Sequence, residues 1–201
     1  MKQAERDYFG GLYELAAAVN SARAPASVLQ SIAENVAKGL SAKGCSLMLL
    51  TPDRKQLLHT ASYGLSDWYV RKGPVSADRS IAEALEGKPV AVLEAAKDER
   101  VQYRDQAKKE GIVSILSVPM MLRETVVGVV RVYTGERRQF TMDDMRFVGA
   151  AANLGAIALE NARLYDSVQK DYEALARDTL EWRAALGREW MTGELVYPFE
   201  D

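Results

Sequence analysis

The spacing of apolar residues changes along the chain, and each change predicts a different element. Apolar residues recur every three or four positions over 4–22 and again over 26–39, which is the period of an amphipathic helix. The break between these stretches falls at Ala24-Pro25, because the residue before a proline is pushed out of the helical region. Two helices are therefore predicted at the start of the chain.

The middle of the chain has the composition of strands and tight turns. Two apolar segments, 45–51 and 56–62, flank the turn Pro-Asp-Arg-Lys and predict a β-hairpin. Segments 114–122 and 126–134 flank a charged three-residue connection in the same way. Between the hairpins we expect an irregular segment (63–79), a short helix closed at Gly87, a short strand from Val90 and a polar helix within 98–112.

A last helix is predicted to begin after Thr141, whose side chain caps it together with Asp144. No stop signal follows until Gly187. Between Thr141 and Gly187, apolar residues recur with the alternating four-three spacing of a coiled coil. We expect this helix to pair with its twin in a homodimer, and the N-terminal helices to complete a four-helix bundle. The predicted dimer seam consists of Phe9, Leu12, Leu154, Asn161, Tyr165, Val168, Tyr172, Leu175 and Trp182, with Asn161 setting the register.

Hairpins in the middle of the chain and helices at its ends predict an α+β domain built on a central antiparallel sheet. Alternation along 126–133 places Arg131 and Tyr133 on one face of the last strand together with Val127 and Val129. The other face is wholly apolar and suits packing against the terminal helices. The sheet face that carries Arg131 and Tyr133 would then line a pocket.

Two interpretations of Arg131 stay open at this point. In the first, the guanidinium meets an anionic ligand in the pocket. In the second, Arg131 extends to the sheet edge or forms a structural ion pair with Glu94 or Asp98.

Composition and charge exclude several classes of protein. With 48% hydrophobic residues, 27% charged residues and a net charge of −2, the chain has no electrostatic reason to bind nucleic acid or an anionic membrane. No apolar run approaches the roughly 20 residues of a spanning helix, and the N-terminus lacks the pattern of a signal peptide. The single cysteine, Cys45, and single histidine, His59, exclude an internal disulfide and a Cys/His zinc cage. We therefore expect a cytoplasmic protein.

Three stretches carry a family resemblance: GCSLMLLTPDRKQLLHTASYGL, SILSVPM and VVGVVRVYTGERRQFTMDDMRFVGAAANLGAIALENARLY. The last is the most specific, with a glycine in the final strand, then F-T-x-x-D, then an alanine-rich helix ending in E-N-A-R-L-Y. Residues 25–166 thereby resemble the GAF family of bacterial signalling domains. They leave an N-terminal helix (1–24) and a C-terminal helical extension and tail (167–201) on either side.

The resemblance implies a GAF-like (PAS/profilin-like) sheet, with the terminal helices on one face and a small-molecule pocket on the other. The irregular middle segment would cover that pocket. The pocket candidates are Tyr63, Trp68, Tyr69, Ile81, Asp98, Tyr103, Ser117, Arg131 and Tyr133. No catalytic residue and no metal ligand is assigned.

The ligands known for the family are disfavoured one by one. Cyclic-nucleotide binding is associated with an Asn-Lys pair after the last strand, where this chain has Thr134-Gly135. Bilin attachment needs a cysteine in the middle segment, and 63–112 contains none. Haem would fall to His59, which alternation places on one strand face with Leu57 and Ala61, but a lone histidine is more often a packed residue. The cofactor is left unassigned.

We therefore expect a non-enzymatic sensory module that binds an unidentified small molecule, dimerises through its terminal helices and signals to a downstream protein. One alternative is a small cytosolic redox enzyme of the free methionine sulfoxide reductase type. Such an enzyme needs a reactive thiolate and normally a second cysteine, whereas Cys45 stands alone in an apolar strand. The other alternative is a purely structural dimerisation domain without a ligand.

Overall fold

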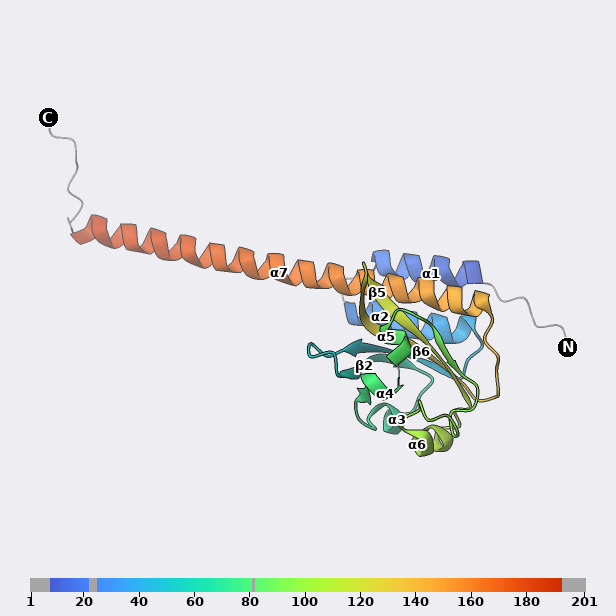
Figure 1. The fold of residues 1–201 in the computed structure, drawn as a ribbon. Coiled ribbons are helices and arrows are strands. Elements are labelled where there is room, and N and C mark those ends of the chain that lie inside the picture. Colours follow the sequence, from blue (N-terminus) through green and yellow to red (C-terminus); the bar gives the residue numbers. More distant parts are fainter. Residues whose placement is uncertain (1–7, 22–24, 81, 193–201) are drawn as a thin grey trace. The chain divides into compact units, whose positions relative to one another are not determined.

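The computed structural model describes residues 8–21, 25–80 and 82–192 (Figure 1). The chain divides after Glu160 into a folded domain and a helical segment that begins at Asn161. The two parts are described separately.

Six strands of the described residues form one sheet in the order β3-β2-β1-β6-β5-β4, and every neighbouring pair is antiparallel. The predicted hairpins are β1–β2 and β5–β6, and β1 pairs with β6 in the middle of the sheet. The outermost strands, β3 and β4, are only two and three residues long. The strands are β1 (Gly44–Leu50), β2 (Gln56–Tyr63), β3 (Val75–Ser76), β4 (Val90–Val92), β5 (Ser114–Leu122) and β6 (Thr125–Thr134).

The terminal helices cover one face of the sheet. Figure 1 shows α1 (Tyr8–Ser21), α2 (Pro25–Gly39) and the part of α7 (Met142–Thr192) up to Glu160 on the same side of the strands. Their apolar stripes and the strand residues that point toward them form the largest buried cluster, which we call the helix-face core. It includes Leu15, Val28, Ile32, Val36, Leu40, Cys45, Leu47, Leu116, Val118, Val130, Val132, Phe147 and Ala151.

Short elements cover the opposite face, and we call residues 64–113, which contain them, the roof. The helices of the roof are α3 (Asp67–Val70), α4 (Ala77–Ser80), α5 (Ala82–Leu85) and α6 (Arg104–Lys109), and the same segment supplies the edge strands β3 and β4 of the sheet. Two smaller apolar clusters lie between the roof and the sheet, one around Tyr69 and Tyr133 and the other around Met48 and Val129. Arg131 and Tyr133 therefore lie on the face opposite the terminal helices, as alternation along the last strand predicts.

A bulge in β2 changes which residues share a face. Leu47 pairs with Ala61 and Met48 with His59, so Thr60 has no partner in the β1 register. As a result His59 lies on the roof face, whereas Ala61 packs in the helix-face core. The prediction that His59 and Ala61 share a face is wrong, because one extra residue reverses the side-chain alternation.

A second bulge affects Val127. Met120 pairs with Gly128 and Met121 with Val126, so Val127 is left out of the β5 register. Val127 packs against the helix-face core instead of lying on the roof face, where strict alternation placed it.

The start of α7 is fixed by the predicted cap. Thr141 N donates to Asp144 Oδ2 (2.9 Å), and Asp144 N donates to Thr141 Oγ1 (3.1 Å). The helix does not end at Gly187 as predicted but continues to Thr192. A glycine costs a helix interior only about 1 kcal/mol relative to alanine, so a single glycine need not stop a helix.

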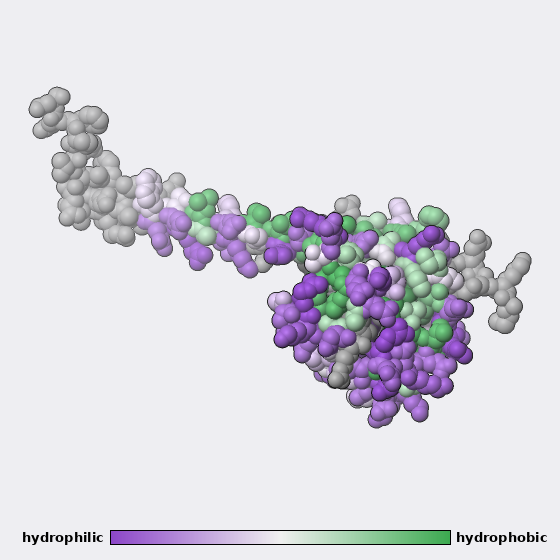
Figure 2. Space-filling model, in the orientation of Figure 1, coloured by the Kyte–Doolittle hydropathy of each residue, from purple (hydrophilic) through white to green (hydrophobic). Residues whose placement is uncertain are grey.

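The predicted seam divides into buried and exposed residues. Leu12 and Leu154 are partly buried and pack against the helix-face core, so they already contribute to the fold of one chain. Phe9 is 88% exposed. Asn161 is also exposed, and Tyr165, Val168, Tyr172, Leu175 and Trp182 are between 66% and 74% exposed. Figure 2 shows hydrophobic side chains among hydrophilic ones along this part of α7.

None of the helices in the described part of the chain is both long and apolar enough to cross a membrane.

Candidate functional site

A row of polar side chains crosses the middle of the sheet on the roof face. Arg131 on β6 pairs in register with Ser46 on β1 and with Ser117 on β5, so the three residues lie side by side. Arg131 Nε donates to Ser117 Oγ (3.0 Å), and Ser46 Oγ lies 3.0 Å from the hydroxyl of Tyr133. All four side chains are buried. The row is unusual because buried strand positions are otherwise mostly apolar here.

The roof places a second tyrosine over this row. Tyr69 in α3 packs edge-on against Tyr133, with ring centres 5.9 Å apart. Its helix is fixed at the start by Ser66, whose hydroxyl accepts from Tyr69 N (3.2 Å). Burial raises the pKa of Tyr69 and of Tyr133, so both phenols are neutral and act only as hydrogen-bond partners.

Lys72 follows α3 and points its ammonium group into the same region. Its Nζ lies 3.7 Å from the ring centre of Tyr69 and 5.6 Å from that of Tyr103. It donates to Tyr69 O (3.0 Å) and lies 3.2 Å from His59 Nε2. Burial, together with the nearby charge of Arg131, lowers the pKa of Lys72 to about 8. Lys72 is therefore still mainly protonated at neutral pH.

His59 reaches this group from β2. Burial and the positive charges of Lys72 and Arg131 lower the pKa of His59 to about 4, so the imidazole is neutral at pH 7. Its second ring nitrogen, Nδ1, is buried and has no hydrogen-bond partner. We call Lys72, His59, Arg131, Tyr69 and Tyr133, with Ser46 and Ser117, the polar cluster.

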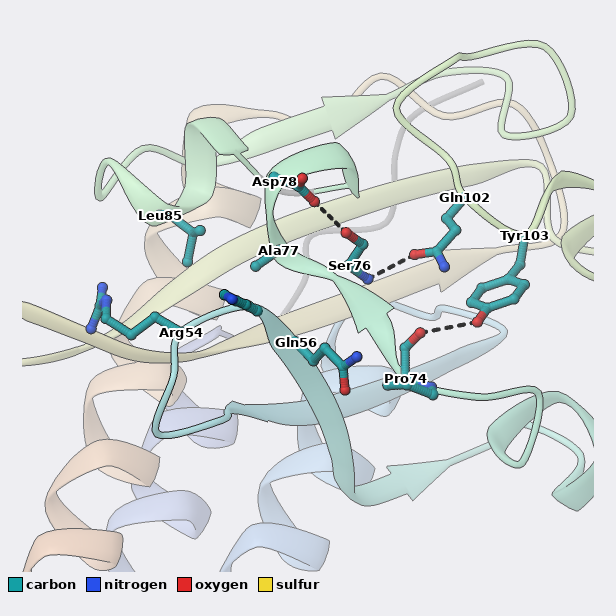
Figure 3. Close-up of a pocket in the computed structure, with 10 residues that line it drawn as sticks. Arg54, Gln56, Pro74, Ser76, Ala77, Asp78, Leu85, Gln102 and Tyr103 are labelled. Atoms are coloured by element: carbon teal, nitrogen blue, oxygen red, sulfur yellow. Dashed lines mark hydrogen bonds between the residues drawn. The ribbon is translucent and has the colours of Figure 1, made fainter.

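A cavity of about 540 Å³ opens beside the polar cluster, between β3 and the loop that precedes α6 (Figure 3). Gln102 Oε1 accepts from Ser76 N (2.7 Å), and the Tyr103 hydroxyl donates to Pro74 O (3.0 Å). Tyr103 contacts both regions, because it lines the cavity and its ring lies near Lys72. The cavity is lined by Arg54, Lys55, Gln56, Pro74, Ser76, Ala77, Asp78, Leu85, Gln102 and Tyr103.

Five of the predicted pocket residues come together. Tyr69, Ser117, Arg131 and Tyr133 belong to the polar cluster, and Tyr103 lies between the cluster and the cavity. These placements agree with the predicted face, and ligand binding by these residues stays a prediction.

Three other predicted residues lie elsewhere, which corrects the pocket list. Tyr63 packs against the helix-face core, since the bulge at Thr60 reverses the end of β2. Trp68 is 51% exposed on the outside of α3. Asp98 forms an ion pair with Arg100 (2.7 Å) in the loop after β4. The remaining candidate, Ile81, lies outside the described residues.

The second interpretation of Arg131 was a structural ion pair with Glu94 or Asp98. The ion pairs that these two carboxylates form do not support it. Glu94 pairs with Lys97 and Arg137. Asp98 pairs with Arg100, whereas the side chain of Arg131 contacts Ser117 and Tyr133.

The predicted pocket list lacks three members of the polar cluster: Ser46, Lys72 and His59, which was weighed only as a haem ligand. The alternation of Ser46 with the apolar Cys45 and Leu47 was a usable signal for a polar residue on the roof face. Lys72 gave no such signal, because it lies in a segment without a period.

Cys45 is buried in the helix-face core, and burial raises the pKa of its thiol. Among the described residues no group of three or more His, Cys, Asp and Glu side chains is arranged to hold a metal ion.

Comparison with known proteins identifies the fold. The family model of the GAF domain matches residues 22–160. The chain belongs to the GAF domain family. No protein with a curated description matches the sequence.

Solved GAF domains have the same architecture. The GAF domain of a phosphoenolpyruvate-protein phosphotransferase from Coxiella burnetii superposes with a TM-score of 0.73 at 17% identity, over 82% of this chain and 99% of that one. The free methionine-R-sulfoxide reductase of Neisseria meningitidis, solved with its substrate, gives 0.66 at 16% identity, over 79% and 91%. The phycocyanobilin-bound GAF domain of a cyanobacterial phytochrome gives 0.64 at 14% identity, over 79% and 97%. At these identities the likeness shows the fold alone.

Proposed function

We propose that this GAF domain is a non-enzymatic sensory or regulatory module that binds a small molecule beneath its roof and dimerises through its terminal helices. GAF domains are generally sensory or regulatory, and relatives of similar fold include phytochrome domains. The observation that carries the proposal for this chain is the polar cluster. Hydrogen bonds within the fold join Arg131 to Ser117 and Ser46 to Tyr133, whereas the buried Nδ1 of His59 has no hydrogen-bond partner. A buried polar group that is left unsatisfied suits a binding site better than a packing surface.

The cavity beside the cluster supports the same function. Its volume of about 540 Å³ falls within the range of small-molecule sites, about 300–1,000 Å³. Tyr103 forms part of its wall and contacts Lys72, so a ligand in the cavity lies next to the polar cluster.

The burial of Cys45 favours binding over catalysis. A reductase of the methionine sulfoxide type needs an accessible thiolate, whereas this thiol lies in the helix-face core and burial raises its pKa. The polar cluster lies on the opposite face of the sheet from Cys45, so a ligand held there would not meet the thiol.

Exposed apolar side chains on the terminal helices support dimerisation. Tyr165, Tyr172 and Trp182 are each more than 60% exposed. Covering about 100 Å² on each of them, at ~25 cal/mol per Å², would contribute on the order of several kcal/mol per chain. A symmetric dimer in which each helix pairs with its twin would supply that cover.

Native mass spectrometry of protein purified without added ligand tests the binding function. We expect a bound species of small-molecule mass, lost on denaturation. A chain that carries nothing, and that no small molecule stabilises in a thermal-shift screen, would leave the purely structural dimerisation domain as the better description.

Sedimentation equilibrium tests the dimer. We expect wild-type protein to be dimeric at tens of micromolar and the double variant Val168→Glu, Leu175→Glu to be monomeric. The matched control, Ser167→Glu with Ala174→Glu, adds the same charge one residue before each seam position and should remain a dimer. A wild-type monomer, or equal behaviour of the two variants, would contradict the helical interface.

A further inference from the structure

We propose that the ligand of this domain carries an oxyanion group, a carboxylate or a phosphate, that accepts a hydrogen bond from His59 Nδ1 and pairs with Lys72 and Arg131. This inference rests on the small-molecule binding proposed above and names the chemical class of the ligand. Its three supports are the tautomer of His59, the charge balance of the polar cluster and the donor geometry.

The contact between Lys72 and His59 determines which imidazole nitrogen carries the proton. Lys72 Nζ lies 3.2 Å from His59 Nε2, and a protonated lysine has donors only. His59 Nε2 must therefore accept, and the proton of the neutral ring lies on Nδ1. That N–H is buried and has no acceptor. An unsatisfied buried donor costs about 1–3 kcal/mol, so the site is complete only when a ligand atom accepts from it.

The charges around His59 specify what kind of acceptor fits. The positive charges of Lys72 and Arg131 both lower the pKa of His59, and the charge of Arg131 also lowers the pKa of Lys72. In the described part of the chain, no carboxylate forms an ion pair with Lys72. The carboxylate that does attract Lys72 is that of Glu110, whose oxygens already accept from Ser66 N (2.8 Å) and Ser66 Oγ (2.6 Å). Buried positive charge of this kind is stabilised by an anion.

The donors are of the types that bind oxyanions. The donors are the ammonium group of Lys72 after α3, the guanidinium group of Arg131 on β6 and the imidazole N–H of His59 on β2. Lys72 lies 3.2 Å from His59, and the charge of Arg131 acts on both residues, so the three groups are neighbours beneath the roof. Hydrogen bonds from charged donors to carboxylate or phosphate oxygens are the strong ones in proteins. The rings of Tyr69 and Tyr103 flank Lys72.

The chain contains a single histidine, which makes the imidazole a direct reporter. We would record the ¹⁵N and ¹³C ring signals of His59 in the tag-free protein while titrating inorganic phosphate and, separately, succinate. Sodium chloride at matched ionic strength is the control. We expect a neutral Nδ1–H tautomer in the free protein and a saturable shift with at least one oxyanion. The titration midpoint of His59 should rise when the anion is bound, because a negative neighbour stabilises the imidazolium.

Two variants of His59 separate its two nitrogens. In His59→Gln, the amide oxygen can still accept from Lys72, but the donor at the Nδ1 position is lost. In His59→Asn, the amide nitrogen takes the place of Nδ1. Calorimetric affinity for the better anion should fall about 10- to 100-fold in the Gln variant and in Lys72→Met, and recover in the Asn variant. Urea unfolding of each variant shows whether the fold is retained.

The outcomes distinguish the ligand class from the binding function itself. A stronger response to phosphate than to succinate assigns a phosphate ligand, and the reverse assigns a carboxylate. An Nε2–H tautomer, or a response no larger than that to chloride, overturns the oxyanion. If the species found by native mass spectrometry is neutral, the oxyanion inference fails while the binding function stands.

Discussion

Replacing Asp144 by alanine should destabilise the domain more than any other single polar substitution near the terminal helices. The side chain is fully buried, and three of its hydrogen bonds connect separate elements. They come from Tyr8 in α1 (2.8 Å), from Arg138 Nη2 (2.8 Å) and from Thr141 N at the start of α7 (2.9 Å). One carboxylate thus joins both terminal helices to the loop after β6.

The expected cost follows from the burial of Arg138. Its side chain is only 9% exposed in the ion pair with Asp144, so removing the carboxylate leaves a buried positive charge. Breaking one partner of a buried pair costs about 3–5 kcal/mol. Loss of the helix cap adds about 1 kcal/mol, which gives an expected loss of roughly 4–6 kcal/mol in unfolding free energy.

Urea unfolding followed by circular dichroism, at one protein concentration for all variants, measures this loss. Tyr8→Phe is the matched control, because it removes only the α1 hydrogen bond and should cost about 1 kcal/mol. The double variant Asp144→Ala, Arg138→Met should be more stable than Asp144→Ala alone, since no charge is left behind. A loss below about 1.5 kcal/mol in Asp144→Ala, or no recovery in the double variant, would contradict the proposed role of this buried ion pair.

Three further predictions concern single residues. The pKa of His59 is lowered from 6.5 to about 4, so its neutral form contributes stability that is complete above pH 6.5 and is lost as the pH falls toward 4. The difference in unfolding free energy between wild type and His59→Gln, measured in urea, should therefore shrink by about 2–3 kcal/mol between pH 6.5 and pH 4. A difference that does not change with pH would contradict the burial of His59. Gly73→Ala should cost more unfolding free energy than Gly111→Ala, because both glycines have positive φ but only at Gly73 would a Cβ atom meet the Tyr103 hydroxyl (2.9 Å); equal costs would count against that contact. Cys45 should react with a thiol reagent only as fast as the domain unfolds, and reaction at the rate of a free thiol would support the reductase instead.

Local signals in the sequence were sufficient for most elements of the fold. Each hairpin was visible because two apolar segments flank a short polar connection, and α7 was visible because Thr141 and Asp144 form a cap. These features depend on neighbouring residues, so they can be read without knowledge of the tertiary structure.

The two bulges could not be read in that way. A strand with one extra residue has the same composition as a regular strand, but every residue beyond the bulge changes face. This is why Ala61, Tyr63 and Val127 were assigned to the wrong side of the sheet.

The face on which a candidate site residue lies could be inferred only along a regular strand. Arg131 and Tyr133 follow the alternation of β6, so their face could be inferred. The position of Lys72 depends on how Ser66 caps α3 and on packing against Tyr69, neither of which has a periodic signature. Tertiary packing of irregular chain therefore explains why Lys72 was missed.

The way in which the sheet ends on each side has a consequence for aggregation. Long, flat outer strands offer unpaired backbone groups to other chains, and this sheet avoids them by ending in β3 and β4, which are two and three residues long. β3 covers only the first two residues of β2, Gln56 and Leu57. Further along β2, the bulge at Thr60 interrupts the strand edge, and the backbone carbonyl of Ser62 accepts a hydrogen bond from Gln30 Nε2 (2.9 Å). Strand-to-strand fibre growth is thereby disfavoured at both borders. The dimer proposed above would therefore form through side chains on the helices and not through strand edges.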